Sequence, residues 1–230
     1  SLGAFEFLVD ASGTGPEFVF IEANARLQVE HTVTEEVTGV DLVQSQIQVA
    51  MGASLASLGL SDPIWPRGFA IQARVNMETL RGDGSVLPGS GTLNAYDPPS
   101  GPGVRVDGFG YVGYQTSTAF DSLLAKVIIS HKAPDFSAVC AKTLRALAEF
   151  RIEGVSTNTE FLMNLITHSD FAAGEIHTRW VDDNLTTLAA PSEARRRFVS
   201  PQAAPGGDGF AGAKVDTSDP LALFAHDADV

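Results

Sequence analysis

The stretch FIEANARLQVEHTVTEEVTGVDLV, residues 20–43, concentrates polar side chains in a fixed order. Within it, Arg26, Gln28 and Glu30 alternate with Leu27 and Val29. An extended backbone would place the first three side chains on one face. A guanidinium fork, an amide donor and a carboxylate in this order suit a small planar oxyanion, whose proton the carboxylate can take. A solvated strand with an ion pair between Arg26 and Glu30 fits the same residues, and the pattern leaves both interpretations open.

A hairpin is predicted immediately before this stretch. Glu6, Leu8 and Asp10 alternate with Phe5, Phe7 and Val9, which is the period of two of a strand. Residues 11–16 have the composition of a turn, and residues 17–21 form the returning strand. Glu6 and Glu22 then approach each other across the hairpin. Neighbouring carboxylates are ligands that a hard cation such as Mg2+ prefers. An ordinary hairpin with two exposed charges is the alternative.

The rest of the chain predicts an α+β fold, with strands first and helices after. A helix is expected over residues 42–51, because Asp41 is a good N-cap and Gly52 follows the end. The strongest helical pattern begins at Asp135 and runs to about Phe150, with apolar residues on one face. Further strands are predicted at 68–76, 104–106 and 125–130, further helices at 158–166 and 180–188, and a glycine- and proline-rich loop with one short strand at 80–102.

Composition narrows the function classes. The chain has 28 acidic and 15 basic side chains and a formal net charge of -13, so nucleic acid is a poor partner because its phosphates would be repelled. The single cysteine, Cys140, cannot form an internal disulfide and is expected to be a small buried residue of a helix. No signal peptide or apolar run of membrane-spanning length is found, so no membrane partner and a cytoplasmic location are expected.

Residues 20–43 closely resemble the signature of biotin carboxylases, the ATP-grasp modules of acetyl-CoA, propionyl-CoA, pyruvate and urea carboxylases. The resemblance covers about residues 1–190. It implies that residues 1–52 are the last piece of an ATP-grasp domain and residues 53–190 the biotin carboxylase C-terminal domain, an antiparallel sheet with helices. Residues 191–230 would be a linker or tail. The other matching stretches are RGFAIQARVN (67–76), GVRVDGFGYVGYQTSTAFDSLLAKVI (103–128), ALAEFRIEGVSTN (146–158) and FAAGEIHTRWVDDNL (171–185).

The resemblance also implies roles for matching residues. The implied bicarbonate site is formed by Arg26, Gln28 and the backbone of Val29, with Glu30 as the general base. Arg105 matches the arginine that stabilises the enolate-like anion of biotin. The implied ligands of the Mg2+ ions beside the ATP phosphates are Glu6, Glu22 and Asn24, and the implied neighbours of the adenine are Leu8, Ile21 and Ile176.

The activity that this resemblance implies is the carboxylation of biotin on a carrier protein, with ATP and bicarbonate as co-substrates and carboxyphosphate as the intermediate. Mg2+, with Mn2+ as a substitute, is the implied metal. The linker-like sequence PQAAPGGDGFAG (201–212) favours a multidomain carboxylase of the acyl-CoA type. The implied partners are a biotinyl carrier domain, a carboxyltransferase and further copies of the chain, in a homodimer or larger oligomer.

Part of the family's machinery has no counterpart in these 230 residues. The family's N-terminal domain, its glycine-rich lid and the lysines that hold the phosphates and bicarbonate would precede residue 1. We therefore expect the chain by itself to be inactive. Two alternatives stay open at this point: a non-catalytic dimerisation fragment, and an ATP-grasp ligase of the carbamoyl-phosphate synthetase type. Ala23 and Ala25 also depart from the family pattern, without touching a named role.

Overall fold

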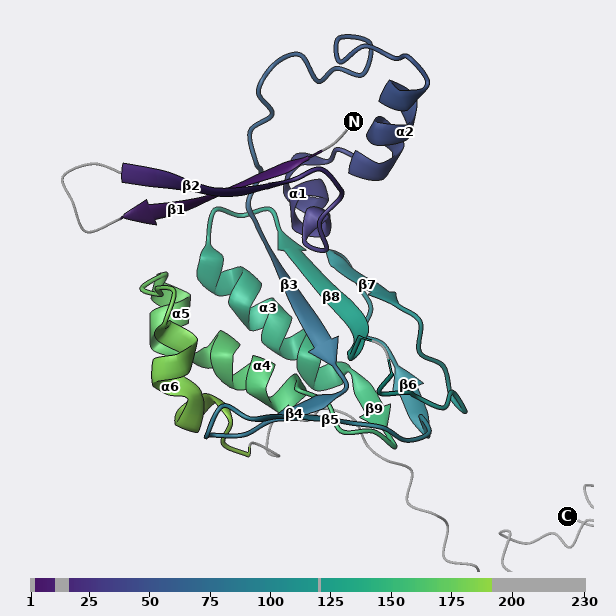
Figure 1. The fold of residues 1–230 in the computed structure, drawn as a ribbon, viewed down its shortest axis with the longest axis vertical. Coiled ribbons are helices and arrows are strands. Elements are labelled where there is room, and N and C mark those ends of the chain that lie inside the picture. Colours follow the sequence, from purple (N-terminus) through teal and green to yellow (C-terminus); the bar gives the residue numbers. More distant parts are fainter. Residues whose placement is uncertain (1–2, 11–16, 120, 192–230) are drawn as a thin grey trace, which may run out of the picture. The chain divides into compact units, whose positions relative to one another are not determined.

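The computed structural model describes residues 3–10, 17–119 and 121–191 (Figure 1). The chain opens with two antiparallel strands, β1 (Ala4–Asp10) and β2 (Glu17–Asn24), followed by helices α1 (His31–Thr38) and α2 (Leu42–Ala50). The mixture of antiparallel strands and helices confirms the predicted α+β class. The predicted turn at 11–16 and all but the first residue of the predicted tail lie outside the described residues.

The β1–β2 hairpin has one irregularity in its pairing. Glu6 lies opposite Glu22, whereas the next residue, Phe7, lies opposite Phe20. Ile21 is therefore the extra residue of a β-bulge. Because successive residues of β1 point to opposite faces, the paired carboxylates lie on one face and the paired phenylalanine rings, with centroids 5.8 Å apart, on the other.

A three-stranded antiparallel sheet follows, in the order β3 (Phe69–Asn76), β8 (Leu123–His131) and β7 (Val104–Gly108). All three strands were predicted to within two residues of their ends. Two pairs of short strands lie beside it: β4 (Glu78–Leu80) with β5 (Val86–Pro88), and β6 (Ala95–Asp97) with β9 (Arg151–Glu153). The predicted loop at 80–102 thus holds both β5 and β6, where one strand was expected, and β9 was not predicted.

Helix α3 (Phe136–Glu149) packs on one face of this sheet and contacts α4 (Thr159–Thr167) (Figure 1). Asp135, where this helix was predicted to begin, is its N-cap residue, and its carboxylate accepts a hydrogen bond from the Ser137 N–H at 2.9 Å. α5 (Ser169–Ala173), which was not predicted, and α6 (Trp180–Leu188), which was, complete the helices of the described chain. Cys140 is buried in the resulting core, as expected. Other core residues are Ala73, Val75, Ala125, Val127, Ile129, Val139, Leu147 and Met163.

The opposite face of the three-stranded sheet is largely polar. Alternate residues point away from α3, and the register places Asp107 beside Lys126, Arg74 beside Lys126 and Arg105 beside Ile128. Helix α1 contacts both β3 and β8, and its Thr32 hydroxyl is hydrogen-bonded to Gln72 of β3. The sheet therefore separates an apolar layer containing α3 from a polar layer containing α1.

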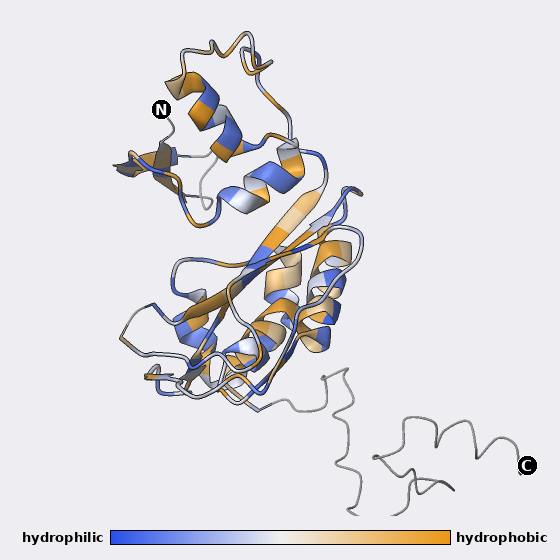
Figure 2. Cartoon of the chain, turned by 90° about the vertical axis from the view of Figure 1, so that its right-hand side faces the viewer, coloured by the Kyte–Doolittle hydropathy of each residue, from blue (hydrophilic) through white to orange (hydrophobic). Residues whose placement is uncertain are grey.

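The described residues among the first fifty bury little apolar surface. The large apolar side chains of the hairpin are all exposed, up to 69% for Phe5, and α2 has no buried residue. Hydrophobic and hydrophilic residues nevertheless alternate along α1 and α2 as they do along the core helices (Figure 2). The exposed apolar side chains of the hairpin are Phe5, Phe7, Leu8, Val9, Phe18, Val19, Phe20 and Ile21.

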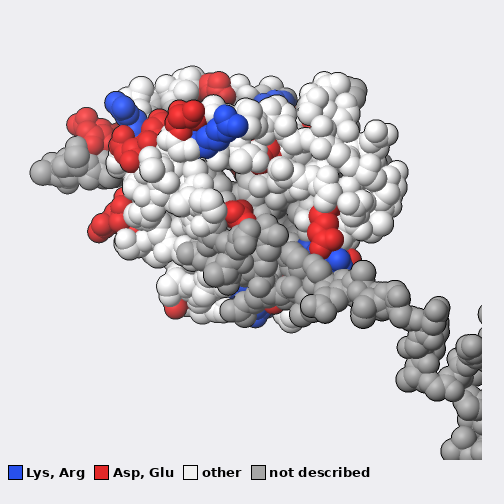
Figure 3. All heavy atoms as spheres, turned by 90° about the horizontal axis from the view of Figure 1, so that it is seen from below, with Lys and Arg blue, Asp and Glu red and all other residues white. Residues whose placement is uncertain are grey.

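Charged side chains on the face drawn in Figure 3 occur in small separate groups of both signs, and no broad basic area is seen among the described residues there. Within the described ranges, no helix has the length and apolar character needed to cross a membrane. The charges that bear on function are instead gathered on the hairpin and between α1 and the sheet.

Candidate active site

The two carboxylates predicted to hold a metal face each other across the hairpin. Glu6 and Glu22 are directly opposite residues, and the Asn24 amide nitrogen donates to Glu6 Oε1 at 3.0 Å and to Glu22 Oε1 at 2.8 Å. One amide thus holds two like charges side by side. Two carboxylates with an adjacent amide are a donor set that Mg2+ accepts. Further ligands would have to come from elsewhere, because no three His, Cys, Asp or Glu side chains form a metal-binding group in the described part of the chain.

Gln28 connects this carboxylate pair to Arg26. Gln28 Nε2 donates to Glu6 Oε1 at 3.2 Å, and Arg26 Nη1 donates to Gln28 Oε1 at 2.9 Å. Arg26, Gln28 and Glu30 together line a hollow of about 270 Å³ beside the start of α1. The predicted metal ligands and the predicted bicarbonate side chains therefore form one hydrogen-bonded series that ends at this hollow.

Glu30 reaches the hollow by a different route from the one predicted. The backbone bends at residues 25–26, and Glu30, with φ -80° and ψ 2°, is the N-cap residue of α1. The segment is therefore not an extended strand with one polar face, and that expectation was wrong. The ion partner of Glu30 is Arg74 of β3, at 3.3 Å, rather than Arg26. A helix start, and not strand alternation, brings Glu30 to the side of Arg26 and Gln28.

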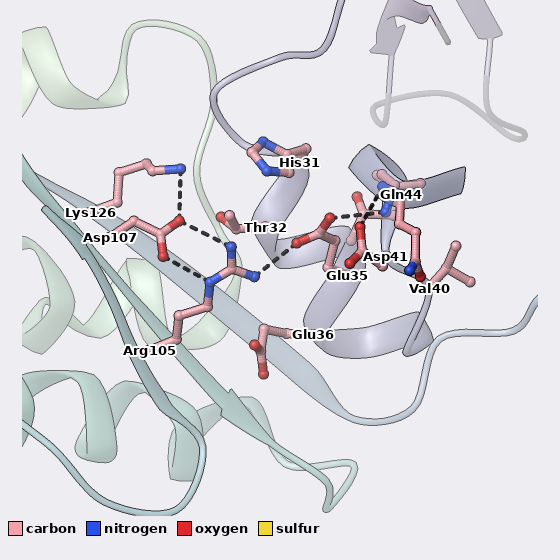
Figure 4. Close-up of polar contacts among 12 residues, drawn as sticks. His31, Thr32, Glu35, Glu36, Val40, Asp41, Gln44, Arg105, Asp107 and Lys126 are labelled. Atoms are coloured by element: carbon pink, nitrogen blue, oxygen red, sulfur yellow. Dashed lines mark hydrogen bonds and ion pairs between the residues drawn. The ribbon is translucent and has the colours of Figure 1, made fainter. Parts of the chain in front are cut away.

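Arg105 lies at the centre of an ion cluster between β7 and α1 (Figure 4). Its Nε and Nη2 donate to the two oxygens of Asp107 at 2.9 and 3.1 Å, and its Nη1 donates to Glu35 Oε2 at 2.8 Å. Lys126 Nζ lies 3.2 Å from Asp107 Oδ2 and donates to the carbonyl oxygen of Val29 at 3.5 Å. One lysine thus joins the cluster to the backbone of the predicted bicarbonate segment.

The charges of this cluster support one another. The hydrogen bonds that Arg105 donates raise its pKa above the usual value, with the larger effect from Asp107 and the smaller from Glu35. Burial pushes the pKa of Asp107 upward, but hydrogen bonds from Arg105 and Lys126 and their positive charges outweigh this effect and lower it. Arg105 and Asp107 therefore remain ionised at neutral pH.

Sequence reasoning missed three members of this cluster. Asp107 was predictable, because it lies two residues after Arg105 in the strand sequence GVRVD, and residues two apart in a strand point to the same face. Glu35 and Lys126 come from other elements, and no spacing rule relates them to Arg105.

The three residues predicted around an adenine lie on separate segments. Leu8 and Ile21 belong to the hairpin, whereas Ile176 lies between α5 and α6. Each side chain is about half exposed, and none of them lines the hollow beside Arg26. Their role stays a prediction.

Two family descriptions match the chain. Residues 72–183 match the biotin carboxylase C-terminal domain, and residues 1–58 match the ATP binding domain of the carbamoyl-phosphate synthase L chain. The chain belongs to the biotin carboxylase family. The first match does not favour a carbamoyl-phosphate synthetase, because it covers the segment that contains Arg105, Asp107 and Lys126.

Named relatives agree with this family. Pyruvate carboxylase of Pichia angusta is 46% identical over 183 residues, and mitochondrial pyruvate carboxylase of Homo sapiens is 46% identical over 184 residues. Each alignment covers 79% of this chain, and the chain spans 15% of the length of either relative.

Solved structures give the same result for the fold. A single-chain, multi-domain long-chain acyl-CoA carboxylase has a TM-score of 0.76 and 45% identity, over 86% of this chain and 21% of that one. The biotin carboxylase domain of 2-oxoglutarate carboxylase from Hydrogenobacter thermophilus, a dimer in complex with MgADP, ADP and bicarbonate, has a TM-score of 0.72 and 34% identity. That match covers 83% of this chain and 40% of the domain.

Proposed function

We propose that this chain supplies the C-terminal part of a biotin carboxylase, which uses Mg-ATP and bicarbonate to carboxylate biotin on a carrier domain. The observation that carries the proposal is the hydrogen-bonded series from Glu22 to Arg26, which ends beside Glu30, in a chain of this family. The related 2-oxoglutarate carboxylase domain, which is in complex with MgADP and bicarbonate, supports these ligands.

In this proposal, Arg26 and Gln28 bind bicarbonate together with the backbone N–H of Val29. Arg26 donates in parallel to two oxygens, and Gln28 can rotate from its present acceptor to meet a third. Glu30 removes the proton of bicarbonate, so that a bicarbonate oxygen attacks the γ-phosphorus of ATP and ADP leaves. The product is carboxyphosphate, which separates into CO2 and phosphate.

Glu6, Glu22 and Asn24 would hold Mg2+, with Mn2+ as a substitute, at the face of the hairpin that they share. The ion would neutralise charge on the ATP phosphates. The exposed apolar side chains of Leu8 and Ile21 suit a neighbouring adenine, and Ile176 is the third proposed contact.

Arg105 would act in the second half of the reaction. Phosphate takes the N1 proton of biotin, and the negative charge spreads to the ureido oxygen, where a guanidinium lowers its energy. N1 then attacks CO2. The residue's partial exposure, 37%, leaves it accessible to biotin from outside.

We further propose a biotinyl carrier domain and a carboxyltransferase as partners, since the relatives include a single-chain multi-domain carboxylase. Dimerisation is proposed because a related domain is named as a dimer. The division at residues 52 and 190 is kept as the proposed domain organisation. A cytoplasmic location is proposed from the composition alone, and the human relative is named mitochondrial.

We also propose that residues 1–230 alone do not catalyse this reaction. The described chain supplies carboxylates and a base, but a cluster of cations for the phosphates is not found on the hairpin, whose described residues include no Lys or Arg. The apolar side chains exposed on both faces of the hairpin support its packing against further protein in the active enzyme. A non-catalytic association module is the alternative for the isolated chain.

The decisive experiment measures ADP release, with and without free biotin and bicarbonate, for the chain alone and for the chain preceded by the N-terminal half of a biotin carboxylase. We expect activity only in the longer protein. There, Glu30→Gln should reduce the rate roughly 10²–10⁴-fold, because it removes a general base.

Glu149→Gln is the matched control. Glu149 is a partly exposed carboxylate of α3 whose ion partner, Arg145, lies on the same helix. The rate of the Glu149→Gln variant should stay within about twofold of that of the unsubstituted longer protein, since exposed ion pairs of this kind contribute little. Activity in the chain alone, or full activity of Glu30→Gln, would contradict the proposal.

A further inference from the structure

Glu35 is a largely buried carboxylate that none of the roles above uses. Its side chain is 12% exposed. Oε2 accepts a hydrogen bond from Arg105 Nη1 at 2.8 Å, and Oε1 accepts one from the backbone N–H of Leu42 at 3.0 Å. Both carboxylate oxygens are therefore held, one by the sheet and one by helix α2.

The second contact makes Glu35 rigid. Leu42 is the first residue of α2, where backbone N–H groups have no partner within the helix. Asp41 satisfies a neighbouring donor, since its Oδ1 accepts from the Gln44 N–H at 2.7 Å. Two carboxylates thus fix the start of α2, and Glu35 cannot move away from Arg105 without exposing the Leu42 N–H.

The contacts of Arg105 leave part of its guanidinium available. The group has five N–H donors, of which Asp107 engages two and Glu35 one. The side chain also borders a hollow of about 370 Å³ at the junction of α1 and α2. Two N–H groups are therefore left to meet a ligand.

The formal charges of the cluster cancel, because Arg105 and Lys126 are matched by Glu35 and Asp107. A neutral hydrogen-bond acceptor can approach such a group without adding uncompensated charge, and the guanidinium of Arg105 then faces the oxygen on which negative charge develops during the reaction. The ureido carbonyl of biotin is a neutral acceptor of this kind.

We propose that Glu35 is a positioning residue, which orients the guanidinium of Arg105 so that its two remaining N–H groups meet the ureido oxygen of biotin. This inference rests on the proposed function, from which the identity of the ligand is taken. Glu35 itself does not touch the substrate in this arrangement.

The test uses the longer protein described above and compares the KM for free biotin with the KM for bicarbonate. Glu35→Gln keeps an oxygen for the Leu42 N–H but removes the charge that holds Arg105. We expect the biotin KM to rise about tenfold, while the bicarbonate KM stays within about twofold, because a charged hydrogen bond is lost only at the biotin site.

Glu36→Gln is the matched control. Glu36 is the next residue of α1 and borders the same hollow, but its carboxylate accepts from the Ser130 hydroxyl at 2.8 Å. Its substitution removes the same charge from the same place without touching Arg105. The biotin KM should then stay within about twofold of the parent, and a rise equal to that of Glu35→Gln would overturn the proposal.

A double mutant separates positioning from a general structural effect. If Glu35 acts through Arg105, adding Glu35→Gln to Arg105→Gln should raise the biotin KM no further, whereas additive effects would overturn the proposal. Arginine-selective NMR of the same proteins gives a readout that is independent of activity. The Nε–H signal of Arg105 should broaden or exchange faster in Glu35→Gln than in Glu36→Gln.

The two proposals fail in different ways. If Arg105→Gln leaves the biotin KM unchanged, the role given to Arg105 is wrong and the role of Glu35 falls with it. If Arg105→Gln raises the biotin KM but Glu35→Gln changes neither the KM nor the NMR signal, only the inference about Glu35 is wrong.

Discussion

At the scale of single residues, Arg105 shows how neighbours define a functional side chain. Three of its hydrogen bonds go to two carboxylates from different elements, and a lysine holds one of those carboxylates in turn. Each member of such a group depends on the others, because removing one leaves a partly buried charge without its partner. The cluster therefore affects both the stability and the orientation of the site.

Asp107→Asn is expected to lower stability at neutral pH, and the deficit should shrink in acid. The folded-state pKa of Asp107 lies below its ordinary value of 3.8. Its stabilising contribution is therefore complete above that value and disappears as the pH falls through the lower, folded-state pKa. Urea unfolding of both proteins at about pH 7 and at steps from about pH 4 downward measures the difference.

Asp97→Asn is the control for this pH dependence. Asp97 also pairs with an arginine, Arg151, but at 3.5 Å and with 64% of its side chain exposed. Its substitution should change stability little at any pH, because exposed ion pairs contribute little. A constant deficit of Asp107→Asn across the whole pH range would show that packing, rather than charge, explains the effect.

Gly154→Ala is expected to destabilise the fold much more than Gly113→Ala. Both glycines have a left-handed φ, 94° and 89°, so both substitutions carry the same backbone strain of about 1–2 kcal/mol. An added Cβ at Gly154 would also overlap the carbonyl oxygen of Thr92, whereas a Cβ at Gly113 would enter open space, with no described atom beyond its chain neighbours within 4 Å. Chemical denaturation should show a further loss of about 2 kcal/mol for Gly154→Ala. Equal losses would mean that the backbone near Thr92 yields.

At the scale of the element, helix α3 and the hairpin differ in how much they contribute to stability. Leu147 of α3 is 1% exposed within the main core, whereas Leu8 of β1 is 50% exposed. Leu147→Ala should cost about 2–5 kcal/mol, because it leaves a cavity in a packed core. Leu8→Ala, the same chemical change, should cost less than about 1 kcal/mol. Urea unfolding of the chain alone measures both losses of stability. Equal losses would contradict the expectation that α3 contributes more to stability than the hairpin.

Local sequence signals predicted some elements and could not predict others. α3 has an Asp135 cap and an apolar face, so both its type and its ends were predictable. The sequence of α1, HTVTEEVT, is rich in β-branched residues of low helix propensity and buries only Thr32. It lies over the sheet through contacts such as Glu36 with Ser130, between residues far apart in sequence. The only local signal for α1 is Gly39, which follows the last residue of the helix in a left-handed conformation and marks where the helix ends.

The candidate site divides in the same way. Glu6 and Glu22 could be paired from the sequence, because a hairpin brings nearby residues together. The ion partner of Glu30 was not predicted, since Arg74 lies on a strand 44 residues away, and the pair with Arg26 that the alternative interpretation required is not formed. Glu35 is 70 residues from Arg105 and could not be predicted as its partner. Tertiary contacts of this length leave no periodic pattern in the sequence, and a family resemblance carries only the residues of its motifs.

At the scale of the whole molecule, the described residues divide into a well-packed part and a sparsely packed part. Every residue of the two hydrophobic clusters lies at residue 73 or later, and Thr32 is the only buried residue before it among those described. Backbone hydrogen bonds of β1, β2 and α2 are therefore protected by little surrounding structure.

Hydrogen exchange of the chain alone should reflect this division. We expect amides of β3, β8 and α3 to exchange slowest, and amides of β1, β2 and α2 to exchange at least about 100-fold faster, because local opening there exposes little apolar surface. Adding the N-terminal half of a biotin carboxylase should slow exchange in the hairpin and leave α3 unchanged. Slow exchange in the hairpin of the isolated chain would contradict this expectation.

The bulge at Ile21 has a consequence for how such chains diverge during evolution. It lies between the Glu6–Glu22 pair and the turn end of the hairpin, where Asp10 lies opposite Glu17. The pairing of β1 with β2 already shifts by one residue at the bulge. Residues can therefore be gained or lost at the turn end of the hairpin while Glu6 and Glu22 stay opposite each other. Insertions and deletions should therefore accumulate on the turn side, and the spacing from Glu22 to Glu30 should stay constant.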